Sequence, residues 1–302
     1  MFSLILLLFL LGALLFDDEK NPMDDAARKE TKGNYVRLGD GITHYEIAGD
    51  PNANTVVLIH GGSVPYFIWD RTFPDLTEQG FRVVRYDLYG RGYSARPDVV
   101  YNPELYRYQL LDLLNALHIT NTVDLVGVSM GSGIAADFTV HFPKRVRKLC
   151  LMDPIGFPVD LPASERLMHI PLLGEYVFTF IGPKSMVSFV EKDLTKKPPP
   201  EYVEAYKKQM QFQGFRHAII STLRNMPLND MKAVYEQIGK SDREILLIWG
   251  TKDTITPYKN NTLARSLMPK AQFLLVDGAG HAAHFERPDI VNPALVRFLS
   301  SK

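Results

Sequence analysis

Short apolar runs alternate with helix-length segments along most of this 302-residue chain, and this alternation limits the folds open to it. The runs are too short for helices and are typical of strands buried on both faces. The pattern predicts an α/β fold with a mostly parallel central sheet and helices on both faces. The predicted strands are Thr55–Ile59, Phe81–Tyr86, Thr122–Val126, Val146–Met152, Glu244–Trp249 and Gln272–Val276, and the predicted helices are Pro103–Leu117, Gly131–Phe142, Tyr258–Met268 and Asp289–Leu299.

A hairpin is expected before the first parallel strand, because Asp-Gly stands between two alternating stretches, Asn34–Leu38 and Ile42–Ile47. The α/β alternation breaks once, from about Phe157 to Lys240, where the patterning is helical and no strand is convincing. We interpret this break as a helical cap inserted over the carboxyl edge of the sheet; the alternative is a set of helices packed into the main core. The predicted domains are a core of residues 34–156 and 241–302 and a cap of residues 157–240.

The first 16 residues, Met1–Phe16, contain no charged side chain. As a helix they would span roughly 24 Å against a hydrocarbon core of about 30 Å, so they predict a short membrane anchor or an uncleaved signal. A cleaved signal is a second possibility, although a basic n-region and a clear small-x-small site are missing. A helix packed on the folded domain is a third. Residues 17–33 are polar and mixed in charge, and we expect a linker there.

The side of the membrane is left open by the sequence. The basic residues Lys20, Arg28, Lys29 and Lys32 all follow the apolar segment. By the positive-inside rule they favour a main domain in the cytoplasm. A signal peptide would instead export it.

Charge and cysteine content argue against several classes of function. Lysine and arginine together number 34, as do aspartate and glutamate, so net charge gives no reason to expect nucleic-acid binding. No glycine-rich P-loop is present. Cys150, the single cysteine, lies in an apolar run and excludes an internal disulfide and a cysteine-based metal site. We expect no metal.

One serine stands between two glycines, Gly127 and Gly131, where a predicted strand passes into a predicted helix. A sharp strand-to-helix turn strains its middle residue, and side chains two positions away on either side would collide. Gly-x-Ser-x-Gly in this context is the pattern of a nucleophile elbow. The pattern predicts Ser129 as a nucleophile, with the Met130 N–H near any negative charge that develops.

A serine hydroxyl needs a base at neutral pH, and the base needs a carboxylate that fixes its tautomer. Among eight histidines, His281 follows the last predicted strand in a glycine-bracketed loop, with His284 as its competitor. Asp253 follows the preceding strand and is the preferred carboxylate, with Asp153 as the alternative. The order Ser129, Asp253, His281 predicts a catalytic triad.

An oxyanion needs a second donor besides Met130. Gly61 and Gly62 follow the first parallel strand and allow the backbone to approach a ligand closely. The Gly62 N–H is the predicted second donor, with Ser63 as the alternative. His60, next to them, is expected to brace this loop rather than act as a base.

Taken together, these stretches resemble the α/β-hydrolase fold superfamily over roughly Tyr35 to Leu299. The resemblance implies a Ser–His–Asp mechanism on carboxylic esters with no metal and no organic cofactor, and it implies that Asp87 to Ser94 is a structural turn. The matching motifs are HGG at His60–Gly62, RYDLYGRGYSARP at Arg85–Pro97, GVSMGS at Gly127–Ser132, WGTKDTITP at Trp249–Pro257 and GAGHAAHFERP at Gly278–Pro288.

Within the superfamily, Gly214–Met226 of the cap is similar to capped esterases and monoacylglycerol lipases. Ser129 argues against epoxide hydrolases and haloalkane dehalogenases, which carry aspartate at that position. We therefore expect a carboxylesterase or lipase-like serine hydrolase acting on small-molecule esters with an acyl chain, monoacylglycerols among them. A carbon–carbon hydrolase, a cofactor-free perhydrolase and a non-catalytic ligand-binding member remain as alternatives.

Overall fold

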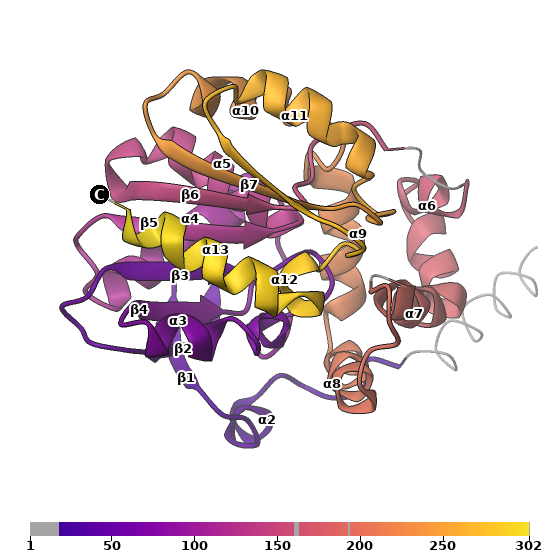
Figure 1. Ribbon diagram of the computed structural model, residues 1–302. Helices are drawn as coiled ribbons and strands as arrows, with labels where there is room; N and C mark the ends of the chain where they lie inside the picture. Colours follow the sequence, from indigo (N-terminus) through magenta and orange to yellow (C-terminus); the bar gives the residue numbers. More distant parts are fainter. Residues whose placement is uncertain (1–17, 160–162, 193, 302) are drawn as a thin grey trace, which may run out of the picture.

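The computed structural model describes residues 18–159, 163–192 and 194–301, which form an eight-stranded sheet flanked by helices (Figure 1). The strand order is β1-β2-β4-β3-β5-β6-β7-β8. β2 pairs antiparallel with β1 and with β4, and the pairings from β4 through β8 are parallel. The strands are β1 (Asn34–Leu38), β2 (Gly41–Ala48), β3 (Thr55–Ile59), β4 (Arg82–Tyr86), β5 (Val123–Val128), β6 (Val146–Met152), β7 (Glu244–Gly250) and β8 (Gln272–Val276).

This arrangement confirms the predicted α/β class with a mostly parallel sheet and helices on both faces. Successive residues of a strand point to opposite faces, so each apolar run supplies two cores. In β3, Val57 and Ile59 belong to one buried cluster and Val56 and Leu58 to the other. Both faces of the sheet are therefore covered, which explains why these strands are continuously apolar.

The helices fall into two layers over the sheet (Figure 1). One layer shares a core cluster with Val57 and Ile59, and the other shares the cluster of Val56 and Leu58. The first layer comprises α4 (Pro103–Ala116), α5 (Met130–His141), α10 (Lys232–Gly239) and α11 (Asn261–Leu267); the second comprises α3 (Phe73–Glu78), α12 (Ala283–Glu286) and α13 (Pro288–Ser300).

The described residues between β6 and β7 contain helices and no strand. Figure 1 shows α6 (Ala163–Met168), α7 (Leu173–Lys192), α8 (Pro200–Met210) and α9 (Phe215–Asn225) grouped beyond one end of the sheet. α10 also falls in the range predicted for the cap, but it packs against α5 and α11. The part of this insertion that lies beyond the sheet is thus α6 to α9, which we call the cap from here on.

The segment predicted as a linker makes ordered contacts with the cap. The Glu19 carboxylate accepts hydrogen bonds from the N–H groups of Gly214 (2.8 Å) and Arg216, at the start of α9. Asn21 pairs through its backbone with Gln211 and Gln213. A short helix, α2 (Asp25–Lys29), follows.

The apolar segment Met1–Phe16 itself lies outside the described residues, so the structure does not test its predicted role. Across the ranges that the structure does cover, no helix has both the length and the apolar character needed to cross a bilayer.

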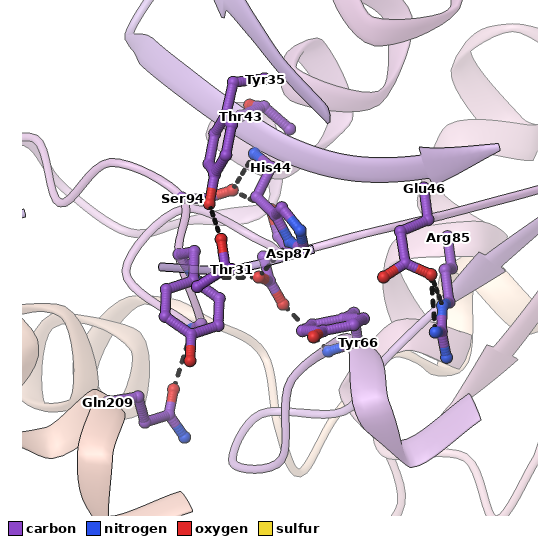
Figure 2. A network of polar contacts seen from close by, with 12 residues as sticks. Thr31, Tyr35, Thr43, His44, Glu46, Tyr66, Arg85, Asp87, Ser94 and Gln209 are labelled. Atoms are coloured by element: carbon purple, nitrogen blue, oxygen red, sulfur yellow. Dashed lines mark hydrogen bonds and ion pairs between the residues drawn. The ribbon is translucent and has the colours of Figure 1, made fainter. Parts of the chain in front are cut away.

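A buried carboxylate, Asp87, holds the turn after β4 and the loop after β3 together (Figure 2). Its Oδ1 accepts the Tyr66 N–H (2.9 Å), and its Oδ2 accepts the Tyr93 N–H (2.9 Å). Oδ2 also lies 2.8 Å from Nδ1 of His44 in β2. One side chain thereby joins β2, the loop after β3 and the turn after β4.

This arrangement favours the protonated, cationic form of His44. Its Nε2 lies 2.8 Å from the Lys32 carbonyl, so both ring nitrogens face acceptors and both can carry a proton. Burial alone would lower the pKa of His44, but the hydrogen bond and charge of Asp87 outweigh it and raise that pKa. Burial alone would likewise raise the pKa of Asp87, and the hydrogen bond and charge of His44 lower it instead.

We predict that His44→Gln destabilises the fold in a pH-dependent way. His44, with a raised pKa, contributes stability fully below about pH 6.5 and loses it as pH rises through the folded-state value. Asp87, with a lowered pKa, contributes above about pH 3.9 and loses it as pH falls through its folded-state value. The variant should therefore lose about 3 kcal/mol of unfolding free energy near pH 5.5 and less in alkaline solution, as measured by urea unfolding. The matched control is His217→Gln at the surface. If the loss of unfolding free energy in His44→Gln stays the same from pH 5.5 to alkaline pH, the charged pair of His44 and Asp87 is contradicted.

Candidate active site

Ser129 lies at the apex of a strained turn between β5 and α5. Its backbone has φ 55° and ψ −120°, a conformation that residues other than glycine rarely adopt. A Cβ at Gly127 would lie 2.3 Å from the Gly131 carbonyl oxygen, and a Cβ at Gly131 would lie 2.1 Å from the Ile59 oxygen. Glycine is therefore required at both predicted elbow positions, and the structure places Ser129 between them.

The start of α5 and the loop after β3 meet at this serine. A Cβ on Gly61 would lie 3.2 Å from the Ser129 Cβ, and one on Gly62 would lie 3.6 Å from the Met130 sulfur. The first N–H groups of a helix have no acceptor within the helix, and the helix dipole favours negative charge there. The two predicted oxyanion donors, Gly62 and Met130, thus belong to neighbouring backbone segments.

Asp253 and His281 come together at the ends of β7 and β8. Asp253 Oδ2 lies 2.9 Å from His281 Nδ1, and both side chains are buried. The other carboxylate oxygen, Oδ1, accepts the N–H groups of Ile255 (2.8 Å) and Thr256 (2.9 Å). Because an ionised carboxylate only accepts, we assign the imidazole proton to Nδ1, which leaves Nε2 as the acceptor.

The Thr256 hydroxyl is a member of this group that the sequence analysis did not identify. It lies 2.7 Å from Asp253 Oδ2, 3.2 Å from His281 Nδ1 and 3.1 Å from the Asp153 carbonyl oxygen. It therefore helps to fix the carboxylate that orients the imidazole. The available signal was the spacing, since a threonine three residues after an aspartate can bond back to it.

The alternative carboxyl group, that of Asp153, lies close by but in a different environment. It is fully buried with φ 45°, and its Oδ1 accepts the Gly250 N–H (2.8 Å). Burial, and then the neighbouring charge of Asp253, raise the pKa of Asp153 well above its usual range. Burial thus disfavours the charged form of Asp153, whereas Asp253 is the carboxylate that contacts His281.

The alternative histidines lie outside this contact. His284 is fully buried with its ring 4.3 Å from that of Trp69, and burial lowers its pKa to about 3. His60 accepts the Leu88 N–H at Nε2 (2.9 Å), so its Nδ1 carries the proton and donates to the Gly61 carbonyl (2.7 Å). Burial lowers the pKa of His60 to about 4. His60 is therefore a neutral brace for the loop, as expected.

No cluster of three or more histidine, cysteine, aspartate or glutamate side chains suited to a metal occurs within residues 18–159, 163–192 and 194–301. A hollow of about 640 Å³ opens between residues 18–21 and the helices α7, α8 and α9. Its lining includes none of the predicted catalytic residues. Its apolar part is formed by side chains of the cap, among them Phe178, Val187, Met210 and Phe215.

Comparison with known proteins agrees with the fold. A family model described as "alpha/beta hydrolase fold" matches residues 54–288. The chain is 27% identical to Lipase 1 of Psychrobacter immobilis over 270 residues, which is 86% of this chain and 81% of the lipase. It is 26% identical to the 2-hydroxy-6-oxo-2,4-heptadienoate hydrolase of Pseudomonas putida over 246 residues, which is 78% of this chain and 84% of that enzyme. A solved structure of a thermophilic esterase from Thermogutta terrifontis superposes with a TM-score of 0.75 at 23% identity, covering 88% of this chain and 98% of the esterase.

We predict that Asp253→Asn lowers kcat by about 10⁴-fold, because an amide N–H facing His281 Nδ1 would select the wrong tautomer. Asp153→Asn should leave kcat close to that of the wild type, since burial already disfavours the charged form of Asp153 and the amide oxygen can still accept the Gly250 N–H. Steady-state kinetics of ester hydrolysis by the two variants, with far-UV circular dichroism to verify folding, tests the assignment. The opposite ranking of the two variants would transfer the role to Asp153.

Proposed function

Because the chain belongs to the α/β-hydrolase fold family and is a hydrolase of that fold, we propose that it cleaves carboxylic esters through an acyl-enzyme on Ser129. The observation that carries this proposal is the backbone of Ser129, held at φ 55° between a buried strand and the N-terminus of α5. A non-glycine residue in such a conformation is costly, and strain of this kind concentrates at functional sites. The contact between Asp253 and His281, at the ends of strands in the same parallel sheet, supports it.

In the proposed mechanism, Ser129 Oγ attacks the ester carbonyl carbon and its proton passes to His281 Nε2. The N–H groups of Met130 and Gly62 bind the oxyanion of the tetrahedral intermediate. His281 then donates its proton to the leaving alcohol, and the acyl-enzyme forms. A water molecule that His281 deprotonates attacks the acyl carbon and releases the acid, while Asp253 stabilises the imidazolium in both steps.

The proposed substrates are esters that carry an acyl chain, monoacylglycerols among them. The name of the Psychrobacter relative, Lipase 1, is consistent with this class. The apolar side chains of the cap also favour it, because Phe178, Met210 and Phe215 share one buried cluster with Val64 and Ile68 of the loop after β3. This apolar packing between the cap and the loop next to Ser129 is what a site for an acyl chain requires.

A carbon–carbon hydrolase is the second candidate. The hydrolase of Pseudomonas putida resembles this chain as closely as the lipase does, at 26% against 27% identity. Both reactions can use a serine, a histidine and an oxyanion hole. The two candidate activities are therefore distinguished by which substrates the protein cleaves.

We expect hydrolysis of p-nitrophenyl butyrate and laurate by residues 18–302, and a loss of kcat of at least about 10⁴-fold in Ser129→Ala. Release of p-nitrophenol is followed by absorbance, and the ratio of the two rates reports the size of the acyl pocket. A vinylogous 1,5-diketone is assayed in parallel. Turnover of the diketone in preference to both esters by the folded wild type would establish the second candidate.

We also propose that the protein works at a lipid surface with its cap turned toward the lipid. Met1–Phe16 is apolar, and Glu19, just after it, is bonded to the start of α9 in the cap. Five of the nine large apolar side chains that are exposed in the described residues lie in the cap. Leu172 is 85% exposed and Ile170 is 47% exposed, and Leu167, Leu173 and Ile181 accompany them. Such a concentration is typical of an interaction surface.

We predict that Leu172→Asp weakens binding of residues 18–302 to phosphatidylcholine vesicles about tenfold, because burying a leucine side chain contributes about 1.5 kcal/mol. The matched control is Leu263→Asp, which alters an exposed leucine of α11 on the core and should bind as the wild type does. Vesicle flotation measures the bound fraction, and the full chain should bind more tightly than residues 18–302. Equal binding by the two leucine variants would exclude the cap as the lipid-facing side.

A further inference from the structure

Three successive carbonyl groups of the loop after β3 are each held by a buried side chain. His60 Nδ1 donates to the Gly61 carbonyl (2.7 Å) and Arg91 Nε to the Gly62 carbonyl (2.8 Å). Gln209 Nε2 donates to the Ser63 carbonyl (3.1 Å). In a trans peptide the carbonyl of one residue and the N–H of the next point in opposite directions. Each bond therefore also fixes the direction of the N–H that follows: His60 fixes that of Gly62, Arg91 that of Ser63, and Gln209 that of Val64.

Two of these three donors depend on the cap. Gln209 belongs to α8 and is 2% exposed, and its Oε1 also accepts the Gly92 N–H (2.8 Å). Arg91 is 1% exposed, and one terminal nitrogen donates to the hydroxyl of Thr222 in α9 (3.0 Å). The other lies 3.4 Å from the Tyr106 hydroxyl in α4. Helices α8 and α9 thus help to set the peptide planes beside Ser129.

We propose that Gln209 and Arg91 are positioning residues through which the cap fixes the loop that carries the oxyanion-binding N–H groups. Arg91 orients the Ser63 N–H directly, and Gln209 holds the peptide group that follows it. The inference rests on the proposed role of Ser129 as a nucleophile. An oxyanion donor stabilises the transition state only when it lies within about 2.7–3.1 Å of the developing charge. Loosening the loop should therefore slow the chemical step, while binding of the uncharged ester changes little.

The charge-altering variant Gln209→Glu separates this role from mere anchoring of the cap. Glutamate keeps the size of the side chain and an acceptor for the Gly92 N–H, but its carboxylate offers no donor to the Ser63 carbonyl. We expect kcat on p-nitrophenyl butyrate to fall about tenfold or more, with KM within about twofold of the wild type.

A trifluoromethyl alkyl ketone provides a second readout that requires no turnover. Ser129 Oγ adds to its carbonyl carbon, the hydroxyl proton passes to His281, and the ketone oxygen becomes an oxyanion. The affinity of Gln209→Glu for this ketone should fall by the same factor as kcat. An anchoring role alone would lower the unfolding temperature without a matching loss of ketone affinity.

Two further variants complete the design. Gln211→Glu makes the same chemical change just beyond the C-terminus of α8, on an exposed side chain whose amide oxygen accepts from Asn21, and it should behave as the wild type. Gln209→Met removes the donor without adding a charge, so it reports on the same bond should the glutamate variant fail to fold. It should show the same losses of kcat and ketone affinity.

Wild-type kcat and ketone affinity in a folded Gln209 variant would overturn the proposal, as would a loss confined to KM or to the unfolding temperature. Absence of ester turnover by the wild type would instead count against the proposed function. The ketone affinities of the wild type and the variants would still decide the positioning role, because adduct formation needs only the serine, the base and the oxyanion donors.

Discussion

The site depends on the close approach of α5 to the end of β3, which two glycines permit. A Cβ at Gly131 would lie 2.1 Å from the Ile59 oxygen, so any other residue there would push the helix away from the strand. The approach places the N-terminus of α5 beside the loop after β3 and forces Ser129 into its strained turn. That strain costs about 1–3 kcal/mol, which the buried packing of β3, β5 and α5 offsets.

Charge in and around the site is set by surroundings rather than by residue type. His44 faces two acceptors, which favour its protonated form, whereas His60 faces one donor and one acceptor and stays neutral. The two carboxyls near His281 differ in the same way, since burial and the neighbouring charge of Asp253 raise the pKa of Asp153. A buried site accommodates one such charge far more readily than two.

The cap and the core form one continuous structure. A Cβ added to Gly90 would lie 2.4 Å from the Cβ of Ala218 in α9. Helix α9 therefore packs closely against the turn after β4. Gln209 and Arg91 add hydrogen bonds across the same boundary, to the loop that lies against Ser129. The ends of the strands carry the residues of the site, and the cap contacts the loop that lies beside Ser129.

Local sequence patterns determined much of this protein. Apolar runs such as Val146–Met152 specified strands to the residue, and the glycines around Ser129 specified the elbow, because both depend on neighbouring residues along the chain. Tertiary structure alone decided that α10 packs on α5, that the Thr256 hydroxyl joins Asp253 and His281, and that Gln209 reaches Ser63. These outcomes depend on contacts between residues far apart in the chain, which amphipathic periodicity does not encode: a helix pattern specifies which face is buried but not which surface buries it.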